Sequence, residues 1–334
     1  MKKLLLILAL LLLLTGCSKE KISGEVQSVT PRGEYIELAI AGKQDTVLAD
    51  ANTHVYSFSD EISYEKLLTG ELIRPVITAY ELRKLDGAWL AERICVESIQ
   101  LPEGYELADG TVLTVRKDYI HTTYITPGGI EILWEQEPIG PDNVNVGGLP
   151  TFDMLNVQVQ EKILSYYKEL GLLYDLNTEL EYAWHCYQTS ENPLLFQSHH
   201  LFQDISPTAA NDKLVWYSIH VTRPVRDGLH QLNSRHTVFD REIGKLIDTS
   251  DLFICGEKEV GKRILEIVNM PDTQLRQEME KAFRFEYLNF HSLALDVCFP
   301  AGSLISQNTD HLLGIEYKDL EGFIHPWAIP DSIE

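Results

Sequence analysis

The sequence begins with an uninterrupted apolar run from Leu4 to Leu14, which follows the positively charged start Met1-Lys2-Lys3. A basic start, an apolar core and small residues before a cleavage point are the three parts of a secretory signal. As a helix, this run would be about 16 Å long, roughly half of the hydrocarbon thickness of a bilayer. We therefore expect it to direct export and to be removed, so that the fold depends on the residues after it.

The tetrapeptide at the end of this run, Leu14-Thr15-Gly16-Cys17, resembles the lipobox of bacterial lipoproteins. The resemblance implies that residues 1–16 are a lipoprotein signal peptide and that Cys17 is diacylated, so that its lipid anchors the protein in the membrane. Residues 17–21 would then form a short lipidated tether. The predicted location is extracytoplasmic, at the outer face of a bacterial cell membrane or in a periplasm. A cleaved signal with an incidental cysteine is the alternative.

Length and charge limit the classes of protein and partner. The residues after position 16 suffice for two ordinary domains and leave room for a small third one, and an apolar fraction of 44% is normal for a globular chain. The formal net charge of −22 repels nucleic acid and anionic lipid and attracts basic proteins. The sequence therefore predicts no nucleic-acid partner. It leaves open whether the charge attracts a cationic protein or serves solubility alone.

Residues 22–99 alternate apolar and polar side chains as strands do, with turn residues between the runs. We expect strands at 22–29, 35–41, 46–48, 53–56, 72–80 and 88–98, and a short capped helix at 63–68. Because an OB-fold barrel has a similar order of strands and helix, the segment is predicted to be a small OB-like β-barrel. An SH3-like barrel or a plain meander barrel remains possible. Its aromatic residues lack a basic run, which favours packing over nucleic-acid binding.

Residues 100–150 are predicted to form a linker at 101–110 and then a hairpin segment with strands at 111–117, 120–124 and 130–136. Residues 138–150 are rich in proline and glycine and should form an irregular connection.

Residues 151–334 are predicted to form an α+β domain with helices packed on one antiparallel sheet. Asn156 should cap a helix at 157–170, which Gly171 ends, and a second helix is expected at 259–268. Asp272 should cap a third helix. Strands are expected at 178–188, 214–222, 237–240, 293–299 and 314–317.

No combination of residues in the sequence predicts a catalytic, metal or cofactor site. The adjacent pairs His185-Cys186 and His199-His200 are the candidates for a metal site, and His220, His230 and His236 are more loosely spaced. Neighbours on a strand point to opposite faces, so at most one of each pair could bind a shared ion. Catalytic and zinc-binding motifs such as G-x-S-x-G and H-E-x-x-H are absent from the sequence.

The cysteines after the predicted lipidation site are far apart and form no C-x-x-C motif, so neither a redox motif nor a zinc knuckle is predicted. An exported protein can pair four cysteines in three ways, and buried free thiols are equally compatible with the apolar neighbours of these residues. The disulfide state therefore stays open for Cys95, Cys186, Cys255 and Cys298.

A longer motif lies at residues 237–253, where Thr237-Val238-Phe239-Asp240 is followed by Gly244-Lys245 and then Asp251-Leu252-Phe253. We expect the polar residues from Asp248 to cap a helical turn whose Leu252 and Phe253 enter the core. The motif resembles the V-x-F-D-x-x-T-G-K and L-x-D-L-F signature of a cell-envelope domain. That domain is the extracytoplasmic part of RsiV-type lysozyme-sensing anti-sigma factors, and it also occurs in membrane-bound peptidoglycan deacetylases.

Further parts of the chain agree with this domain in their order: Gln160-Glu161-Lys162-Ile163, Phe299-Pro300-Ala301-Gly302 and residues 315–320. The resemblance covers about residues 140–330 and includes neither a sigma-binding segment nor a deacetylase catalytic domain. Glu242-Ile243 and Glu316 depart from its usual pattern.

The resemblance implies a binding or sensing module. We therefore expect a non-enzymatic cell-envelope lipoprotein that binds a protein such as lysozyme or a peptidoglycan fragment. The alternatives are an envelope hydrolase and a structural assembly lipoprotein. The sequence assigns no ligand-binding residue.

Overall fold

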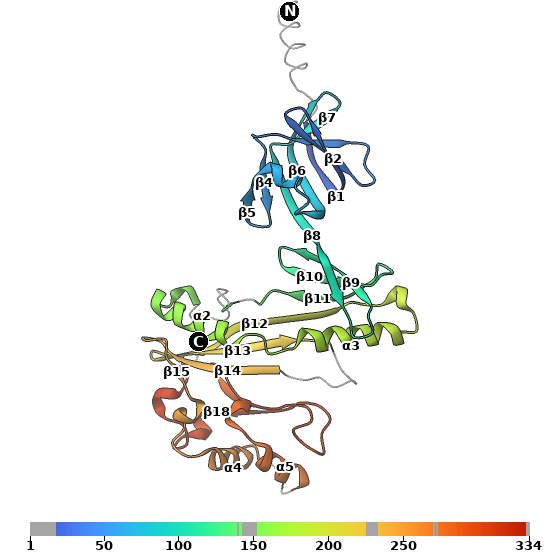
Figure 1. Ribbon diagram of the computed structural model, residues 1–334. Helices are drawn as coiled ribbons and strands as arrows, with labels where there is room; N and C mark the ends of the chain where they lie inside the picture. Colours follow the sequence, from blue (N-terminus) through green and yellow to red (C-terminus); the bar gives the residue numbers. More distant parts are fainter. Residues whose placement is uncertain are drawn as a thin grey trace, which may run out of the picture. The chain divides into compact units, whose positions relative to one another are not determined.

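Figure 1 shows the computed structural model, which describes residues 18–138, 140–141, 152–224, 233–269, 271 and 273–331. Of these residues, those up to 135 together with 184–198 form one compact unit, and the others form a second. The predicted signal peptide and Cys17 lie outside the described residues. In the described ranges, no helix has the length and apolar character needed to cross a bilayer.

The first unit consists mainly of β-strands. Its elements are β1 (Ser18–Arg32), β2 (Tyr35–Ile40), β3 (Thr46–Ala49), β4 (His54–Ser57), β5 (Asp60–Ile62), the 3-10 helix η1 (Tyr64–Leu67), β6 (Ile73–Leu85), β7 (Ala88–Leu90), β8 (Arg93–Glu106), β9 (Val112–Asp118), β10 (His121–Ile125) and β11 (Glu131–Gln136). Except for β5, each of these strands overlaps a predicted strand, and η1 follows the predicted cap Ser63.

The strand pairing of the first unit returns to its starting strand. The first half of β1, up to Glu25, pairs antiparallel with β6, and its second half, from Val26, pairs antiparallel with β2. β2 pairs with β3, β3 pairs in parallel with β7, and β7 pairs with β6. Side chains of these strands are buried in a common hydrophobic cluster that includes Leu38, Val47, Ile77 and Trp89. The alternation that predicted the strands thus also identifies their buried face.

The predicted linker at 101–110 is wrong for its first half, because β8 continues to Glu106. Pro102 and Gly104 lie where the pairing of β8 with β9 is interrupted, between Leu101 and Tyr105. An interruption of this kind tolerates a proline, since the unpaired residue needs no N–H group for the ladder. Gly104 has a φ of +64°, and a Cβ atom there would lie 2.7 Å from the carbonyl oxygen of Leu113.

The second unit combines helices with two antiparallel ladders, which confirms the α+β class. One ladder has the order β12-β13-β14-β15 and the other β16-β17-β18, whereas one sheet was predicted. The elements are α2 (Val157–Leu170), α3 (Leu176–Thr189, whose last turns belong to the first unit), β12 (His199–Ala210), β13 (Leu214–Thr222), β14 (Asn233–Asp240), β15 (Leu246–Ile247), α4 (Glu257–Ile267), α5 (Gln274–Ala282), β16 (Leu288–Phe290), β17 (Ala294–Phe299) and β18 (His311–Glu316). Short 3-10 helices complete it: η2 (Phe152–Met154), η4 (Thr249–Leu252), η5 (Phe285–Tyr287), η6 (Tyr317–Leu320) and η7 (Pro326–Ala328), with η3 (Pro193–Leu195) in the first unit.

The predicted helix at 157–170 is confirmed as α2, whereas the predicted strand at 178–188 is wrong. The side chain of Asn156 accepts a hydrogen bond from the N–H of Gln158, and Gly171 follows the last turn of α2. Residues 178–188, predicted as a strand, belong to α3. Its first turn is capped by Asp175, whose Oδ1 accepts from the N–H of Thr178 at 2.8 Å. α4 is also confirmed, and Thr273 caps α5, while the predicted cap Asp272 lies outside the described residues.

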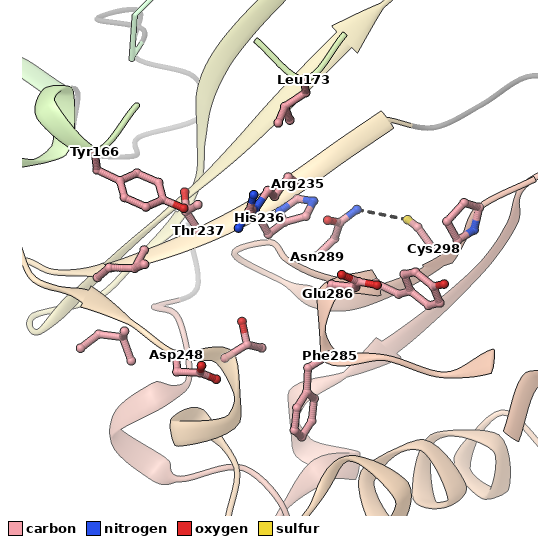
Figure 2. A pocket seen from close by; sticks show the side chains of 15 residues that line it. Tyr166, Leu173, Arg235, His236, Thr237, Asp248, Phe285, Glu286, Asn289 and Cys298 are labelled. Atoms are coloured by element: carbon pink, nitrogen blue, oxygen red, sulfur yellow. Dashed lines mark hydrogen bonds between the residues drawn. The ribbon is translucent and has the colours of Figure 1, made fainter. Parts of the chain in front are cut away.

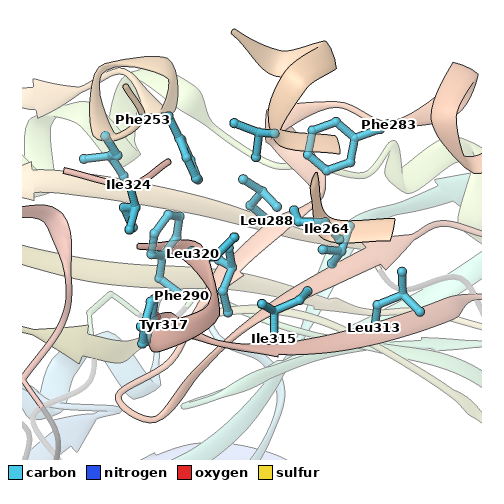
Figure 3. Packing of buried hydrophobic residues seen from close by; sticks show 14 of the residues in the cluster. Phe253, Ile264, Phe283, Leu288, Phe290, Leu313, Ile315, Tyr317, Leu320 and Ile324 are labelled. Carbon is cyan, nitrogen blue, oxygen red and sulfur yellow. The ribbon is translucent and has the colours of Figure 1, made fainter. Parts of the chain in front are cut away.

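The ladder β12–β15 is covered on both faces. On one face, Val159, Ile163 and Tyr167 of α2 pack against Tyr217 and other residues of the strands. On the other face, Trp216 and Val238 join a larger core that contains residues of β16–β18, α4 and α5. Figure 3 shows part of this core, including Phe290, Ile264 and Phe283. η4 begins after Asp248 and buries Leu252 and Phe253, as predicted.

A buried asparagine joins the turn between β12 and β13 to residues near 328. The Oδ1 atom of Asn211 accepts hydrogen bonds from the N–H groups of Lys213 and Leu214, at 2.9 and 2.7 Å. Its Nδ2 atom donates to the carbonyl oxygens of Trp327 and Ile329, at 3.1 and 2.9 Å. The amide thus has partners for both of its donors and for its acceptor, which a buried side chain of this kind requires.

Candidate binding pocket

Strand β14 has an open outer edge. Its inner edge pairs with β13 along the whole length from Asn233 to Asp240. On the outer edge, β15 pairs only with Val238 and Phe239. In the described part of the chain, residues 233–237 therefore pair with no further strand on that side, although β16 and η5 lie near β14.

A pocket of about 570 Å³ lies beside this open edge. Three consecutive residues of β14, Arg235, His236 and Thr237, form one wall. Figure 2 shows the other walls, which come from α2 and the loop after it, from η4 and from the region between η5 and β17. These walls include Tyr166, Leu173, Asp248, Phe285, Glu286, Asn289 and Cys298.

His236 is neutral at physiological pH. Its Nε2 atom lies 3.4 Å from the hydroxyl oxygen of Ser218 on β13. Burial lowers the pKa of His236 to about 3, and the nearby His291 and His220 act in the same direction because like charges oppose protonation. The imidazole therefore contributes hydrogen-bonding nitrogens to the pocket rather than a positive charge.

Asn289 and Cys298 form a hydrogen-bonded pair at the back of the pocket. The Nδ2 atom of Asn289 donates to the Sγ atom of Cys298 at 3.1 Å. Burial raises the pKa of the Cys298 thiol to about 11, so the sulfur is protonated near neutral pH and lacks the nucleophilic strength of a thiolate. The side chain of Asn289 is buried, with an exposed fraction of 7%.

The charged groups of the pocket are one guanidinium and two carboxylates. Arg235 and Glu286 are exposed at its mouth. Asp248 accepts hydrogen bonds from the N–H and hydroxyl of Ser250, which lower the pKa of its carboxyl group and keep it ionised. Together with the aromatic walls and the open strand edge, these groups are suited to holding a ligand.

The residues singled out in the sequence are spread over both units. His185 and Cys186 lie on helix α3 and not on the predicted strand, so the geometry of neighbouring strand residues does not apply to them. His199 and His200 begin β12. His230, like Cys17, lies outside the described residues. Within the described ranges, no group of three or more His, Cys, Asp or Glu residues is placed to hold a metal ion.

The disulfide question that the sequence left open has an answer in the structure. The four cysteines after the predicted lipidation site are all free thiols: Cys95, Cys186, Cys255 and Cys298.

Sequence reasoning missed the pocket because no local pattern marks it. The predicted strand began at Thr237, four residues after the true start of β14. The residues of β14 that the prediction left out include Arg235 and His236. They do not alternate between apolar and polar side chains, because they lie at an open edge of the sheet. Glu286 and Asn289 approach β14 only through the fold, so no spacing in the sequence relates them to it.

The motif at 240–245 is a structural turn that packs against α2. The Oδ1 atom of Asp240 accepts hydrogen bonds from the N–H groups of Glu242 and Ile243. Gly244 has a φ of +67°, and a Cβ atom there would lie 3.2 Å from the Cα atom of Val159. Lys162 donates from Nζ to the carbonyl oxygen of Ile243 at 2.8 Å. This part of the family-like pattern therefore maintains the turn between β14 and β15.

Comparisons with known proteins found structural similarity without a sequence match. No protein-family model matches the sequence, and no curated protein matches it. A crystal structure of a DUF3298 family protein from Pseudomonas aeruginosa is similar with a TM-score of 0.33 and 13% identity, over 63% of this chain and 94% of that one. A DUF3298 family member from Bacteroides fragilis has a TM-score of 0.32 and 12% identity, over 69% of this chain and 92% of that one.

Proposed function

We propose that this protein is a non-enzymatic cell-envelope lipoprotein, anchored outside the cytoplasmic membrane by the lipid on Cys17, that binds or senses a ligand. The ligand is a protein such as lysozyme or a fragment of peptidoglycan, and it binds in the pocket beside β14. The pocket carries the proposal, because it combines aromatic walls with converging polar groups from four parts of the second unit. The lipobox-like sequence supports the anchor, and the resemblance of residues 140–330 supports the ligand class.

We further propose that residues 22–99 are an OB-like barrel between the tether and the binding unit. The circuit of strand pairs from β1 through β2, β3, β7 and β6 back to β1 supports this proposal. The parallel pair β3–β7 and the helical turn η1 between β3 and β6 are consistent with it.

The binding function can be tested by calorimetry on residues 18–334, which include every described residue. We expect saturable binding of lysozyme or of purified muropeptides at low and at near-physiological salt. Exposed charges alone are screened over about 8 Å at physiological ionic strength, so binding that vanishes in salt would contradict a specific site. Muropeptides should be recovered unchanged by mass spectrometry, and their cleavage would contradict a non-enzymatic role.

A bulky substitution tests the location of the site. Arg235→Trp places a large side chain at the mouth of the pocket and should weaken binding at least tenfold. Lys245→Trp is the matched control, since Lys245 is also an exposed cation near β14 but does not line the pocket. Equal affinities for the two variants would exclude this pocket as the binding site.

A further inference from the structure

We propose that the pocket takes an extended polypeptide segment with basic side chains, which adds to the outer edge of β14 as a further strand. This inference rests on the proposed binding function and names the chemical class of the ligand. It implies recognition of main-chain groups along β14, with side-chain preferences set by the walls of the pocket.

The open edge of β14 has the length that strand addition needs. Residues 233–237 lie beyond the contact with β15, and five residues of antiparallel strand extend for about 17 Å. An edge strand presents N–H and C=O groups that a neighbouring chain can pair with. The inner edge is fully paired with β13, so the strand itself is held firmly in place.

The pocket follows the edge of the strand rather than one face of the sheet. Successive side chains of a strand point to opposite faces, yet Arg235, His236 and Thr237 all line the pocket. In Figure 2, Tyr166 and Leu173 lie on one side of β14, and Phe285 and Glu286 on the other. A ligand that fills this space therefore runs past the main chain of β14, as an added strand does.

Two buried polar atoms in the pocket have no hydrogen-bond partner within the described chain. They are the Oδ1 atom of Asn289 and the Nδ1 atom of His236. Asn289 lies on β16, across the pocket from β14, and β16 pairs with β17 alone among the described strands. A buried acceptor without a partner is unfavourable, because it has lost its hydrogen bonds to water. Oδ1 has almost no exposed surface in the free protein, so a peptide N–H group would become its partner once the side chain of Asn289 turns toward the pocket.

The charge of the pocket favours basic side chains on the ligand. Asp248 and Glu286 outnumber the single guanidinium of Arg235, and the whole chain carries a formal charge of −22. An anionic segment would approach against this field, whereas a cationic one is attracted. Glycan and muropeptide ligands, which lack an extended basic main chain, are the competing occupants that the experiment must separate.

The test uses an octapeptide of alternating threonine and lysine and two derivatives that carry N-methyl groups at alternate residues. Each derivative removes the N–H groups of one edge of the peptide but keeps its charge. In calorimetry with residues 18–334 at near-physiological salt, we expect one derivative to bind at least tenfold more weakly than the parent and the other to bind normally. Hydrogen exchange should slow at amides within 233–237 when the parent peptide binds.

A charge variant of the protein tests the preference for basic side chains. Glu286→Gln should weaken binding of the octapeptide about threefold or more. Glu280→Gln is the matched control, because Glu280 is exposed on α5 and does not line the pocket. Equal effects of the two substitutions would overturn the proposed charge preference.

The outcomes distinguish this inference from the proposed function. Equal binding of the peptide and both derivatives, or unchanged exchange at 233–237, would overturn strand addition. A second outcome is that muropeptides bind, that Arg235→Trp abolishes this binding, and that the octapeptide does not bind. In that case the polypeptide ligand is wrong, but the proposed binding function is retained. If lysozyme, muropeptides and the octapeptide all fail to bind, both proposals are wrong.

Discussion

At the scale of single residues, Gly244 shows why one position of the family-like motif requires glycine. Its positive φ is costly for any residue with a Cβ atom, and its Cα lies close to the main chain of α2. The turn that contains it also receives the hydrogen bond from Lys162. The positive φ and the close contact with α2 therefore both favour glycine at position 244.

We predict that Gly244→Ala lowers the free energy of unfolding by about 1–2 kcal/mol, as measured by urea denaturation. The added methyl group meets Val159 and Lys162 and also strains the backbone. The control is Gly302→Ala, where φ is +82° but no atom lies within 4 Å of the added Cβ. Equal losses in the two variants would show that the contact with α2 contributes nothing.

At the scale of elements, the sequence predicted the helices and strands whose ends are marked by capping or turn residues. The apolar residues of α2 recur with helical spacing, and Asn156 and Gly171 stand directly before and after them. Both ends of the helix were therefore predicted correctly. The aromatic side chains of Tyr182, Trp184 and Tyr187 in α3 favour a strand by propensity, in agreement with the strand that was predicted for residues 178–188. The cap at Asp175 was not recognised in the sequence. The helix buries Leu180 and Ala183 at helical spacing, which tertiary packing selects.

The candidate pocket could not be predicted in the same way. His236, Asp248 and Cys298 were each noted in the sequence, but separately and for other reasons. They line one pocket because β14, η4 and β17 converge in the fold, and this convergence brings together side chains as far apart in sequence as His236 and Cys298. Local patterns carry no information about such contacts.

Helices α4 and α5 offer a test of packing between elements. An ideal Cβ atom on Gly261 of α4 would lie 2.7 Å from Cδ1 and 2.8 Å from Cγ of Phe283. Alanine favours a helix over glycine by about 1 kcal/mol, but overpacking a core costs about 1–3 kcal/mol. We predict a net loss of stability of about 1 kcal/mol for Gly261→Ala, measured by urea denaturation.

A double substitution identifies the cause of this loss. Phe283→Leu should destabilise the protein alone, but Gly261→Ala should cost less in its presence, because the smaller side chain leaves room for the methyl group. A gain of stability from Gly261→Ala in the wild-type background would contradict the close packing seen in the structure.

At the scale of the whole molecule, the histidines give folding stability a dependence on pH. The pKa of His236 is about 3 in the folded chain and about 6.5 as a free side chain. The unfolded state therefore binds a proton that the folded state excludes, so stability falls as pH decreases from about 6.5 toward 3. Ser218 and His220 of β13 and His291 face this ring, and both of these histidines oppose its protonation.

We predict that His236→Gln makes stability less dependent on pH. Between pH 7 and pH 5, the wild type should lose about 2 kcal/mol more than the variant, from the proton taken up by His236 on unfolding. Urea denaturation of both proteins at the two pH values measures the difference, and carboxylate effects common to both cancel. Identical pH dependence in the two proteins would place His236 in water rather than in the folded interior.

The hydrogen bonds of Asn211 also affect the order in which parts of the second unit can fold. The turn at Asn211 belongs to the middle of the second unit, but the acceptors of its amide nitrogen lie 116 and 118 residues later, at Trp327 and Ile329. A chain that is synthesised from its N-terminus contains this turn well before those residues are added. The ladder β12–β15 can therefore form early, but its turn is completed only after nearly the whole second unit has emerged. Contacts of such long sequence separation also slow folding, so the unit spends this interval incomplete.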